Sequence, residues 1–275
     1  MDRPIAIFDS GVGGLTVMRE VANLLPGEHI VYFGDTARVP YGIKGKDTII
    51  RFARENVRFL MGYDPKLVVV ACNTASAVAL PALREALEVT VLGVVEPSAA
   101  VAAETTRSGR IAVLATETTV ASGAYVRAIH EHKPEAEVFQ KACPLLVPMV
   151  EEGRTDTDRV VELVLEEYLG PARSFGPDVV VLGCTHYPML AEGVGRGMGR
   201  GVRVVDSARA TALEVAVVLN QSGLVRKEKR GHYRFLVTDN PQRFETIGRR
   251  FMGERVTAVE LVDPEQFFAA VEGKR

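Results

Sequence analysis

Val68-Val-Val-Ala-Cys-Asn-Thr-Ala-Ser76 is the stretch that decides the fold, and Val179-Val-Val-Leu-Gly-Cys-Thr-His-Tyr-Pro188 repeats its pattern later in the chain. Each is a β-branched apolar run of buried-strand length that ends abruptly at a cysteine and a short polar cluster. Ligands of parallel α/β sheets bind just beyond the carboxyl ends of the strands. The two stretches therefore predict two halves of one site, in which Cys72 faces Cys184.

The composition of the 275-residue chain is that of a globular protein with one large or two modest domains. Its 33 basic and 35 acidic residues offer no electrostatic basis for binding nucleic acid. No apolar run approaches the roughly 18 to 20 residues that span a bilayer, and no signal-peptide segment opens the chain. Three cysteines are an odd number in a chain too large to need disulfides, so we expect a cytoplasmic protein with free thiols and no membrane contact.

Short apolar runs alternate with segments of helical spacing along most of the chain, which indicates βαβ units and a parallel sheet. The expected strands are residues 5–8, 29–33, 68–72, 89–95, 110–115, 138–141, 179–184, 232–237 and 256–261. The expected helices are residues 15–25, 46–61, 74–88, 98–107, 125–132, 156–169, 208–220 and 241–251. Residues 116–119 are expected to form a turn. We therefore predict an α/β fold.

An internal repeat divides this α/β pattern into two. Ile5-Ala-Ile-Phe-Asp-Ser10 matches Ile111-Ala-Val-Leu-Ala-Thr116, as the Cys72 strand matches the Cys184 strand. We predict two similar lobes with the site in the cleft between them. Because no third copy follows, residues 1–97 plus 208–275 are expected to form the first lobe and residues 98–207 the second. The glycine-rich segment 193–201 is expected to be a loop or a weak surface helix, since each Gly costs a helix about 1 kcal/mol.

Cys72 and Cys184 are the strongest candidates for chemistry. A single free cysteine is often only a small buried hydrophobic residue, but two at matching points of a repeat favour a function. A thiolate and a thiol on either side of one carbon can remove a proton from one face and deliver one to the other. Thiols with a pKa of about 8.5 need activation at neutral pH, for which Asp9 and His186 are candidates beside Cys72 and Cys184. Cys143 has no matching position and is expected to be structural.

Several segments offer groups that can bind an anion. Asp9-Ser-Gly-Val-Gly-Gly14 follows a strand and opens a helix, where backbone N–H groups hold anions. Thr16 stands where the dinucleotide fingerprint needs a small residue, although Asp35 mimics its ribose-binding acid, so a nucleotide site stays an alternative to a carboxylate site. Pro40-Tyr41-Gly42, Asn73-Thr74 and Thr185 would add donors suited to a small acid with carboxylates and an amine, unless they only form turns and caps.

Two other interpretations of these residues carry less support. Cys72, Cys184 and His186 are possible zinc ligands, but no Cys-x-x-Cys or histidine-rich spacing accompanies them. A redox disulfide between the two cysteines is disfavoured in a reducing compartment. Glu151 follows an apolar run and either lies in a solvated turn or reaches the cleft.

Four separated motifs closely resemble those of the glutamate racemase family, and the likeness covers nearly the whole chain. They are Phe8-Asp-Ser-Gly-Val-Gly-Gly-Leu-Thr-Val17, Gly34-Asp-Thr-Ala-Arg-Val-Pro-Tyr-Gly42, Ala71-Cys-Asn-Thr-Ala-Ser76 and Gly183-Cys-Thr-His-Tyr-Pro188. The likeness continues through residues 143–153 and 205–207. The departures, Ser98 where glycine is common and the glycine-rich segment 193–201, lie outside the motifs.

The resemblance implies cofactor-independent racemisation of glutamate, which supplies D-glutamate for peptidoglycan, by two α/β lobes in pseudo-twofold relation that usually assemble as a homodimer. It implies that Cys72 takes the proton from D-glutamate and Cys184 from L-glutamate, each reprotonating the other face. Asp9 and His186 would assist them, with Glu151 as a supporting acid on the Cys184 side. The implied substrate contacts are Asp9, Ser10, Pro40, Tyr41, Gly42, Asn73, Thr74, Thr185 and His186.

Three alternatives stay open at this point. An aspartate racemase would use the same chemistry, since one methylene of pocket depth changes affinity by only about 1 to 3 kcal/mol. A binding protein for acidic amino acids would have no use for two matched thiols. A nucleotide-dependent oxidoreductase is the third. For the racemase, we expect a hinge motion that closes the cleft and expels water.

Overall fold

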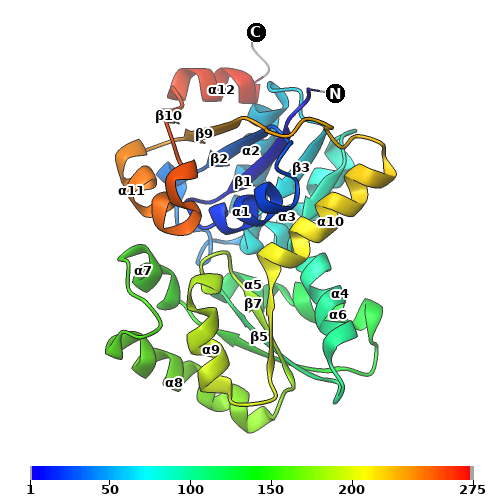
Figure 1. Cartoon of the computed structure of the whole chain (residues 1–275), viewed down its shortest axis with the longest axis vertical. Coiled ribbons are helices and arrows are strands. Elements are labelled where there is room, and N and C mark those ends of the chain that lie inside the picture. The colour runs from blue at the N-terminus through cyan, green and yellow to red at the C-terminus, as the bar shows by residue number, and fades with distance from the viewer. Residues whose placement is uncertain (1, 273–275) are drawn as a thin grey trace.

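The computed structural model describes residues 2–272, which form two α/β lobes (Figure 1). The first lobe holds a six-stranded sheet in the order β10–β9–β2–β1–β3–β4, and the second a four-stranded sheet in the order β6–β5–β7–β8. Every strand pair is parallel. The predicted α/β class with two parallel-sheet lobes is confirmed.

The strands of the first sheet are β1 (Ile5–Asp9), β2 (Ile30–Gly34), β3 (Leu67–Val70), β4 (Val91–Gly93), β9 (Tyr233–Val237) and β10 (Val259–Leu261). Those of the second are β5 (Arg110–Ala115), β6 (Glu137–Ala142), β7 (Val179–Gly183) and β8 (Arg203–Asp206). The order β2–β1–β3–β4 in one sheet corresponds to β6–β5–β7–β8 in the other. The sheets therefore repeat one topology, and the sequence echo pairs β1 with β5 and β3 with β7.

Helices cover both sheets (Figure 1). With the first sheet lie α1 (Leu15–Leu24), α2 (Lys46–Met61), α3 (Asn73–Ala86), α10 (Ser207–Gln221), α11 (Pro241–Met252) and α12 (Pro264–Glu272). With the second lie α4 (Val95–Thr105), α5 (Glu117–Ser122), α6 (Ala124–His132), α7 (Leu146–Glu151), α8 (Arg159–Phe175) and α9 (Ala191–Met198). Short 3-10 turns occupy Thr36–Arg38, Tyr187–Leu190 and Gly253–Arg255. Within residues 2–272, no helix combines the length and apolar character needed to cross a bilayer.

The central strands are buried along their whole length because helices cover both faces of each sheet. Every residue of β1, β2, β3 and β7 is buried, as the continuous apolar runs of the sequence predict. One apolar cluster runs from Ile5 and Ile7 in β1 to Val180 and Leu182 in β7. The lobes therefore share packed core, which holds the carboxyl ends of β1, β3, β5 and β7 near one another.

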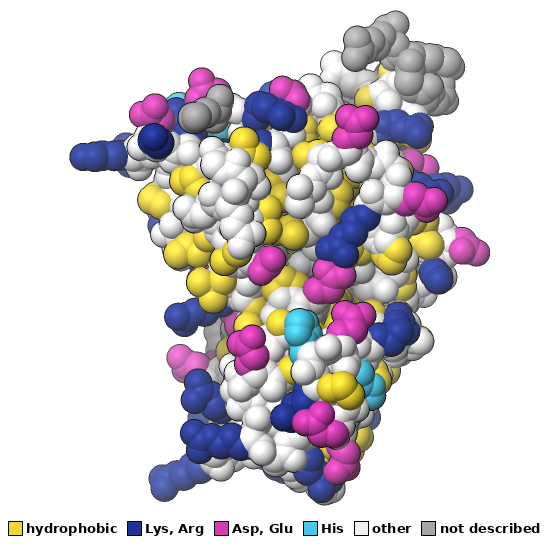
Figure 2. Space-filling model, turned by 90° about the vertical axis from the view of Figure 1, so that its right-hand side faces the viewer, with side chains coloured by type: hydrophobic (Ala, Val, Ile, Leu, Met, Phe, Trp, Pro, Cys, Tyr) yellow, Lys and Arg dark blue, Asp and Glu magenta, His cyan; other side chains and the backbone are white. Residues whose placement is uncertain are grey.

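Residues after Asp206 return to the first lobe, where β9 pairs with β2 and β10 with β9. The change of lobe falls near α4, which begins at Val95, and near α10, which begins at Ser207. The boundaries at residues 97/98 and 207/208 stay a prediction. On the face drawn in Figure 2, acidic and basic side chains lie interspersed, in keeping with the net charge of −2.

The glycine-rich segment 193–201 was predicted to be a loop or a weak surface helix, and residues 193–198 belong to a helix, α9, that is partly buried. A Cβ on Gly193 would lie 2.7 Å from the Asp156 Cβ and 3.0 Å from Leu165 Cδ1. A Cβ on Gly197 would lie 2.5 Å from Leu169 Cδ1. The glycines therefore let α9 approach α8, and this close packing offsets their low helix propensity.

Four further elements differ from prediction. Residues 116–119 do not form an isolated turn, because Thr116 caps α5 by accepting a hydrogen bond from the Thr119 N–H. Helices α7 and α12 and strand β8 were not predicted. Strand β8 is short and only partly buried, and α7 carries a proline, so neither has a clear periodic signal.

Candidate active site

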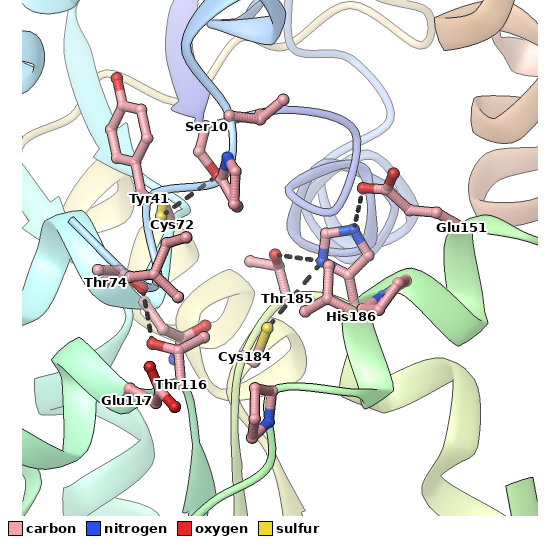
Figure 3. Close-up of a pocket in the computed structure, with 18 residues that line it drawn as sticks. Ser10, Tyr41, Cys72, Thr74, Thr116, Glu117, Glu151, Cys184, Thr185 and His186 are labelled. Carbon is pink, nitrogen blue, oxygen red and sulfur yellow. Dashed lines mark hydrogen bonds and ion pairs between the residues drawn. The ribbon is translucent and has the colours of Figure 1, made fainter.

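A cavity of about 350 Å³ lies between the lobes at the carboxyl ends of the strands (Figure 3). The structure brings most of the predicted site residues to its wall: Ser10, Pro40, Tyr41, Gly42, Cys72, Asn73, Thr74, Glu151, Cys184, Thr185 and His186. Cys72 and Cys184 are both free and buried, as is Cys143. The sequence thus located the cavity correctly from two strand ends.

Cys72 lies two residues beyond β3, at the N-cap of α3. Its Sγ lies 3.7 Å from the Ser10 hydroxyl. Burial raises the pKa of the Cys72 thiol to about 12, the negative charge of Asp9 adds to this, and hydrogen bonds from the Ala75 N–H and Ser10 oppose it. Cys72 is therefore a protonated thiol at neutral pH.

Asp9 ends β1 and lies behind the cavity wall, with no exposed surface. Its Oδ2 accepts a hydrogen bond of 2.9 Å from the Gly11 N–H, and its Oδ1 has no partner among the described residues. Burial raises the pKa of Asp9, while the charge of His186 opposes this effect. The structure places Asp9 near Cys72 but not on the wall itself, so its predicted contact with a substrate stays a prediction.

A charged chain supports Cys184 on the other side. The Cys184 Sγ lies 4.0 Å from His186 Nδ1, and His186 Nε2 lies 3.0 Å from Glu151 Oε1. Burial alone would lower the pKa of His186, but its hydrogen bonds with Cys184 and Glu151 outweigh burial and raise it to about 10. Burial likewise acts against ionisation of Glu151, yet His186 and Arg243 lower its pKa. The imidazole is therefore protonated at neutral pH between a sulfur and a carboxylate.

Tyr41 faces the cavity with its backbone and not with its hydroxyl. The hydroxyl donates to the buried carboxylate of Asp35 and accepts a 3.1 Å hydrogen bond from Asn56 Nδ2. In Figure 3 the phenol ring of Tyr41 points away from the two cysteines. The hydroxyl is therefore engaged with Asp35 and Asn56, and the predicted contact of Tyr41 with a substrate stays a prediction.

Hydroxyl and amide groups line the side of the cavity near α3. Thr74 Oγ1 lies 2.9 Å from Thr116 Oγ1, which joins the two lobes. Asn73 donates a 2.8 Å hydrogen bond to the Tyr125 hydroxyl, and its Oδ1 lacks a partner in the described part of the chain. Sequence reasoning missed Thr116 and its neighbour Glu117 as wall residues. The signal was present, because Thr116 matches Ser10 in the repeat.

The backbone of the first lobe approaches the second closely at Gly13. A Cβ on Gly13 would lie 2.5 Å from His186 Cε1, and closer still to His186 Nδ1 and Thr185 Oγ1. Thr16 adds a 2.9 Å hydrogen bond from its hydroxyl to the Thr185 carbonyl. These contacts press the glycine-rich loop of the first lobe onto the segment that follows Cys184, and no larger residue fits at Gly13 without movement.

Apolar residues complete the wall, and their pattern in the sequence was not distinguishable from that of core residues. They are Val39, Ile43, Pro144, Val147 and Pro148. Across residues 2–272, no three His, Cys, Asp or Glu side chains converge in an arrangement that could hold a metal ion. The arrangement can thus do acid–base chemistry with two thiols on a small molecule that the lobes enclose.

Known racemases resemble this chain along most of its length. Residues 7–215 match the model of the family described as Asp/Glu/Hydantoin racemase. The glutamate racemase of Geobacter metallireducens is 49% identical over 264 residues, which cover 96% of this chain and 97% of that protein.

Solved structures show the same likeness. A glutamate racemase of Bacillus anthracis has a TM-score of 0.90 at 37% identity, covering 95% of this chain and 98% of that chain. The glutamate racemase of Francisella tularensis in complex with D-glutamate has a TM-score of 0.89 at 36% identity, with the same coverage of 95% and 98%.

Proposed function

Because this chain belongs to the Asp/Glu/Hydantoin racemase family, we propose that it interconverts L- and D-glutamate with two cysteine thiols as the acid and the base. The observation that carries the proposal is the pair of buried thiols, Cys72 and Cys184, on the wall of one small cavity. The relatives named glutamate racemase, which align over nearly their whole length, support glutamate as the substrate.

The two thiols have the unequal surroundings that a two-base reaction needs. The His186 imidazolium lies beside Cys184, with its Nδ1 4.0 Å from the Cys184 Sγ, where it can stabilise negative charge. Burial and Asp9 keep Cys72 protonated, with a pKa of about 12. In this proposal Cys184 acts as the base toward L-glutamate and Cys72 as the acid on the same cavity.

One turnover from L-glutamate is then a pair of proton transfers. The Cys184 thiolate takes the α-proton and becomes a thiol, which leaves negative charge on the α-carbon. The Cys72 thiol delivers its proton to the opposite face and becomes a thiolate. The product is D-glutamate, and the reverse reaction starts from the form that this turnover leaves behind. Because the two thiols supply both the base and the acid, the reaction requires no added cofactor.

Neutral donors bind the substrate carboxylates in this proposal. None of the wall residues in the described part of the chain is Lys or Arg. Ser10, Thr74, Thr116 and Thr185 supply hydroxyl groups, and the start of α3 supplies backbone N–H groups that favour an anion. Preorganised donors in a cavity that excludes water also stabilise the negative charge that develops on the α-carbon.

The test is α-proton exchange followed by NMR in deuterated water, with L- or D-glutamate and no added cofactor. We expect the wild type to racemise both enantiomers, and Cys72→Ala and Cys184→Ala each to lose interconversion by at least the roughly 10² to 10⁴ of one acid–base group. Cys143→Ala is the matched control, because that thiol is buried away from the cavity wall.

Two outcomes would refute the proposal in different parts. A wild type that racemises glutamate while both cysteine variants stay within tenfold of it would exclude the two-thiol mechanism. A wild type that leaves glutamate unchanged would exclude the substrate, and aspartate would then be assayed in the same way.

The proposal also includes a supply of D-glutamate for peptidoglycan and assembly as a homodimer, both of which the family resemblance implies. Deletion of the gene should create a requirement for D-glutamate that wild-type protein, but not Cys184→Ala, relieves. Sedimentation equilibrium of the purified protein measures the mass of the assembly directly.

A further inference from the structure

Helix α11 of the first lobe contacts the residues of the second lobe that support Cys184. Arg243 Nη2 lies 3.6 Å from Glu151 Oε2. About two helical turns further on, along the same face of α11, Arg250 donates a 3.1 Å hydrogen bond to the Glu151 carbonyl. The Phe251 ring meets the His186 ring edge-on, with 5.7 Å between centroids. Figure 1 shows α11 directly over α7, the helix that ends at Glu151.

Arg243 and His186 bind different oxygens of the same carboxylate. Glu151 Oε1 contacts His186 Nε2 at 3.0 Å, and Oε2 faces Arg243. A carboxylate held only through Oε1 is free to rotate about its last bond. The ion pair with Arg243 favours the carboxylate orientation in which Oε2 faces the guanidinium and Oε1 faces His186, and so it favours the orientation in which His186 points toward Cys184.

The two thiols differ in where their support comes from. Ser10 and Asp9, which flank Cys72, belong to the same lobe as Cys72. Cys184, His186 and Glu151 lie together in the second lobe (Figure 3). Arg243, which pairs with Glu151, belongs to the first lobe.

We propose that Arg243 is a positioning residue for the Cys184 side of the reaction, which completes the Glu151–His186 pair only when the lobes are closed. This inference rests on the proposed racemase function and assigns it a residue outside the cavity wall. Arg243 touches neither the thiols nor the cavity, so it acts through Glu151. Closure of the lobes thereby orients the acid–base group of one face and leaves that of the other face unchanged.

The size of the effect is modest because the Arg243 side chain is 53% exposed. Half-exposed ion pairs support changes of about two- to fivefold, so we expect kcat/KM of Arg243→Met to fall by that factor. A fall of this size does not by itself distinguish positioning from a general structural effect. The two are distinguished by which proton transfer is slowed, the one at Cys184 or the one at Cys72.

Deuterium isotope effects on kcat/KM show which of the two proton transfers is slowed. The two enantiomers have equal free energy in water, so kcat/KM must fall equally in both directions in any variant. A higher barrier at Cys184 makes removal of the α-deuteron from L-glutamate more rate-limiting and removal from D-glutamate less so. The deuterium isotope effect on kcat/KM should therefore rise for α-deuterated L-glutamate and fall for α-deuterated D-glutamate.

The experiment measures these isotope effects for the wild type, Arg243→Met and three comparison variants. Arg249→Met is the matched control, since Arg249 lies on the same helix with 49% exposure and pairs with Glu245. Glu152→Gln controls for the second carboxylate near Arg243, which is 3.7 Å away. Arg243→Lys restores the charge and should recover most of the wild-type isotope effects.

The inference stands if the two isotope effects move in opposite directions in Arg243→Met and stay at wild-type values in Arg249→Met and Glu152→Gln. It is overturned if both effects stay unchanged or move together in Arg243→Met, or if Arg249→Met behaves in the same way. Failure of the proposed function is a separate result, because it would be seen as absence of racemisation in the wild type.

Discussion

Gly13→Ala tests whether the lobes must close to the distance that the structure gives. The added Cβ would lie 2.5 Å from His186 Cε1, whereas ordinary contact begins at 3.4 Å. Because His186 Nδ1 and Thr185 Oγ1 lie closer still, His186 and Thr185 must retreat by more than about 0.9 Å, or the lobes must open by as much. A misplacement of about 1 Å at a catalytic group can reduce the rate by about 100-fold.

The substitution leaves the first lobe intact. Gly13 does not adopt the left-handed backbone conformation that disfavours alanine, and the atoms it would strike belong to Thr185 and His186 of the other lobe. We therefore expect kcat/KM to fall by about 100-fold for both enantiomers. The structural shifts that accommodate the added methyl group should lower the free energy of unfolding by no more than about 1 to 3 kcal/mol.

The matched control is Gly45→Ala, where the added Cβ meets no atom within 4 Å and the backbone φ is −66°. Steady-state kinetics with L- and D-glutamate and thermal unfolding would be measured on both variants. The reasoning is refuted if Gly13→Ala retains kcat/KM within about threefold of Gly45→Ala, since a closed contact between Gly13 and His186 could not then be part of the active state.

Three further changes have defined outcomes. Burial lowers the pKa of His186, but its hydrogen bonds with Cys184 and Glu151 raise it to about 10. The proton on His186 therefore stabilises the fold fully below pH 6.5, and this stabilisation is lost as the pH rises through 10. In urea unfolding between pH 6.5 and 10, the wild type should lose stability relative to His186→Asn. Tyr41→Phe removes a hydrogen bond to the buried Asp35 carboxylate and should lower the free energy of unfolding by about 1.5 to 3 kcal/mol, with kcat little changed because the hydroxyl points away from the cavity. Lys66→Met leaves the buried carboxylate of Glu28 unpaired and should cost about 3 to 5 kcal/mol by urea titration, most of which a second change, Glu28→Gln, should restore.

The sequence was informative wherever one local signal determined the structure. Continuous β-branched runs produced the buried strands, and the polar residues that end them marked the site, because parallel strands end at the same edge of a sheet. The internal repeat also predicted that two cysteines would share a cavity. All of these inferences need only residues adjacent in the chain or one comparison between two segments.

The contacts that the sequence did not reveal join residues far apart in the chain. Arg243 reaches Glu151 and Gly13 abuts His186, and neither pairing leaves a periodic or local signal. The Leu169 side chain packs against α9 at Gly197, where a residue with a Cβ would overlap it. Such contacts depend on how the lobes meet, and strand and helix patterns do not encode that.

The repeat also explains why the two sides of the cavity differ. Position by position, Asp9 in β1 corresponds to Ala115 in β5, and His186 after Cys184 corresponds to Thr74 after Cys72. Two thiols with identical neighbours would hold a shared proton equally often, so neither would be fixed as the acid or the base. The two copies of the repeat carry equivalent thiols, but the carboxyl group of Asp9 lies near Cys72 and the imidazolium of His186 lies near Cys184. In the proposed mechanism, this difference between their neighbours distinguishes the thiol that acts as the base from the thiol that acts as the acid.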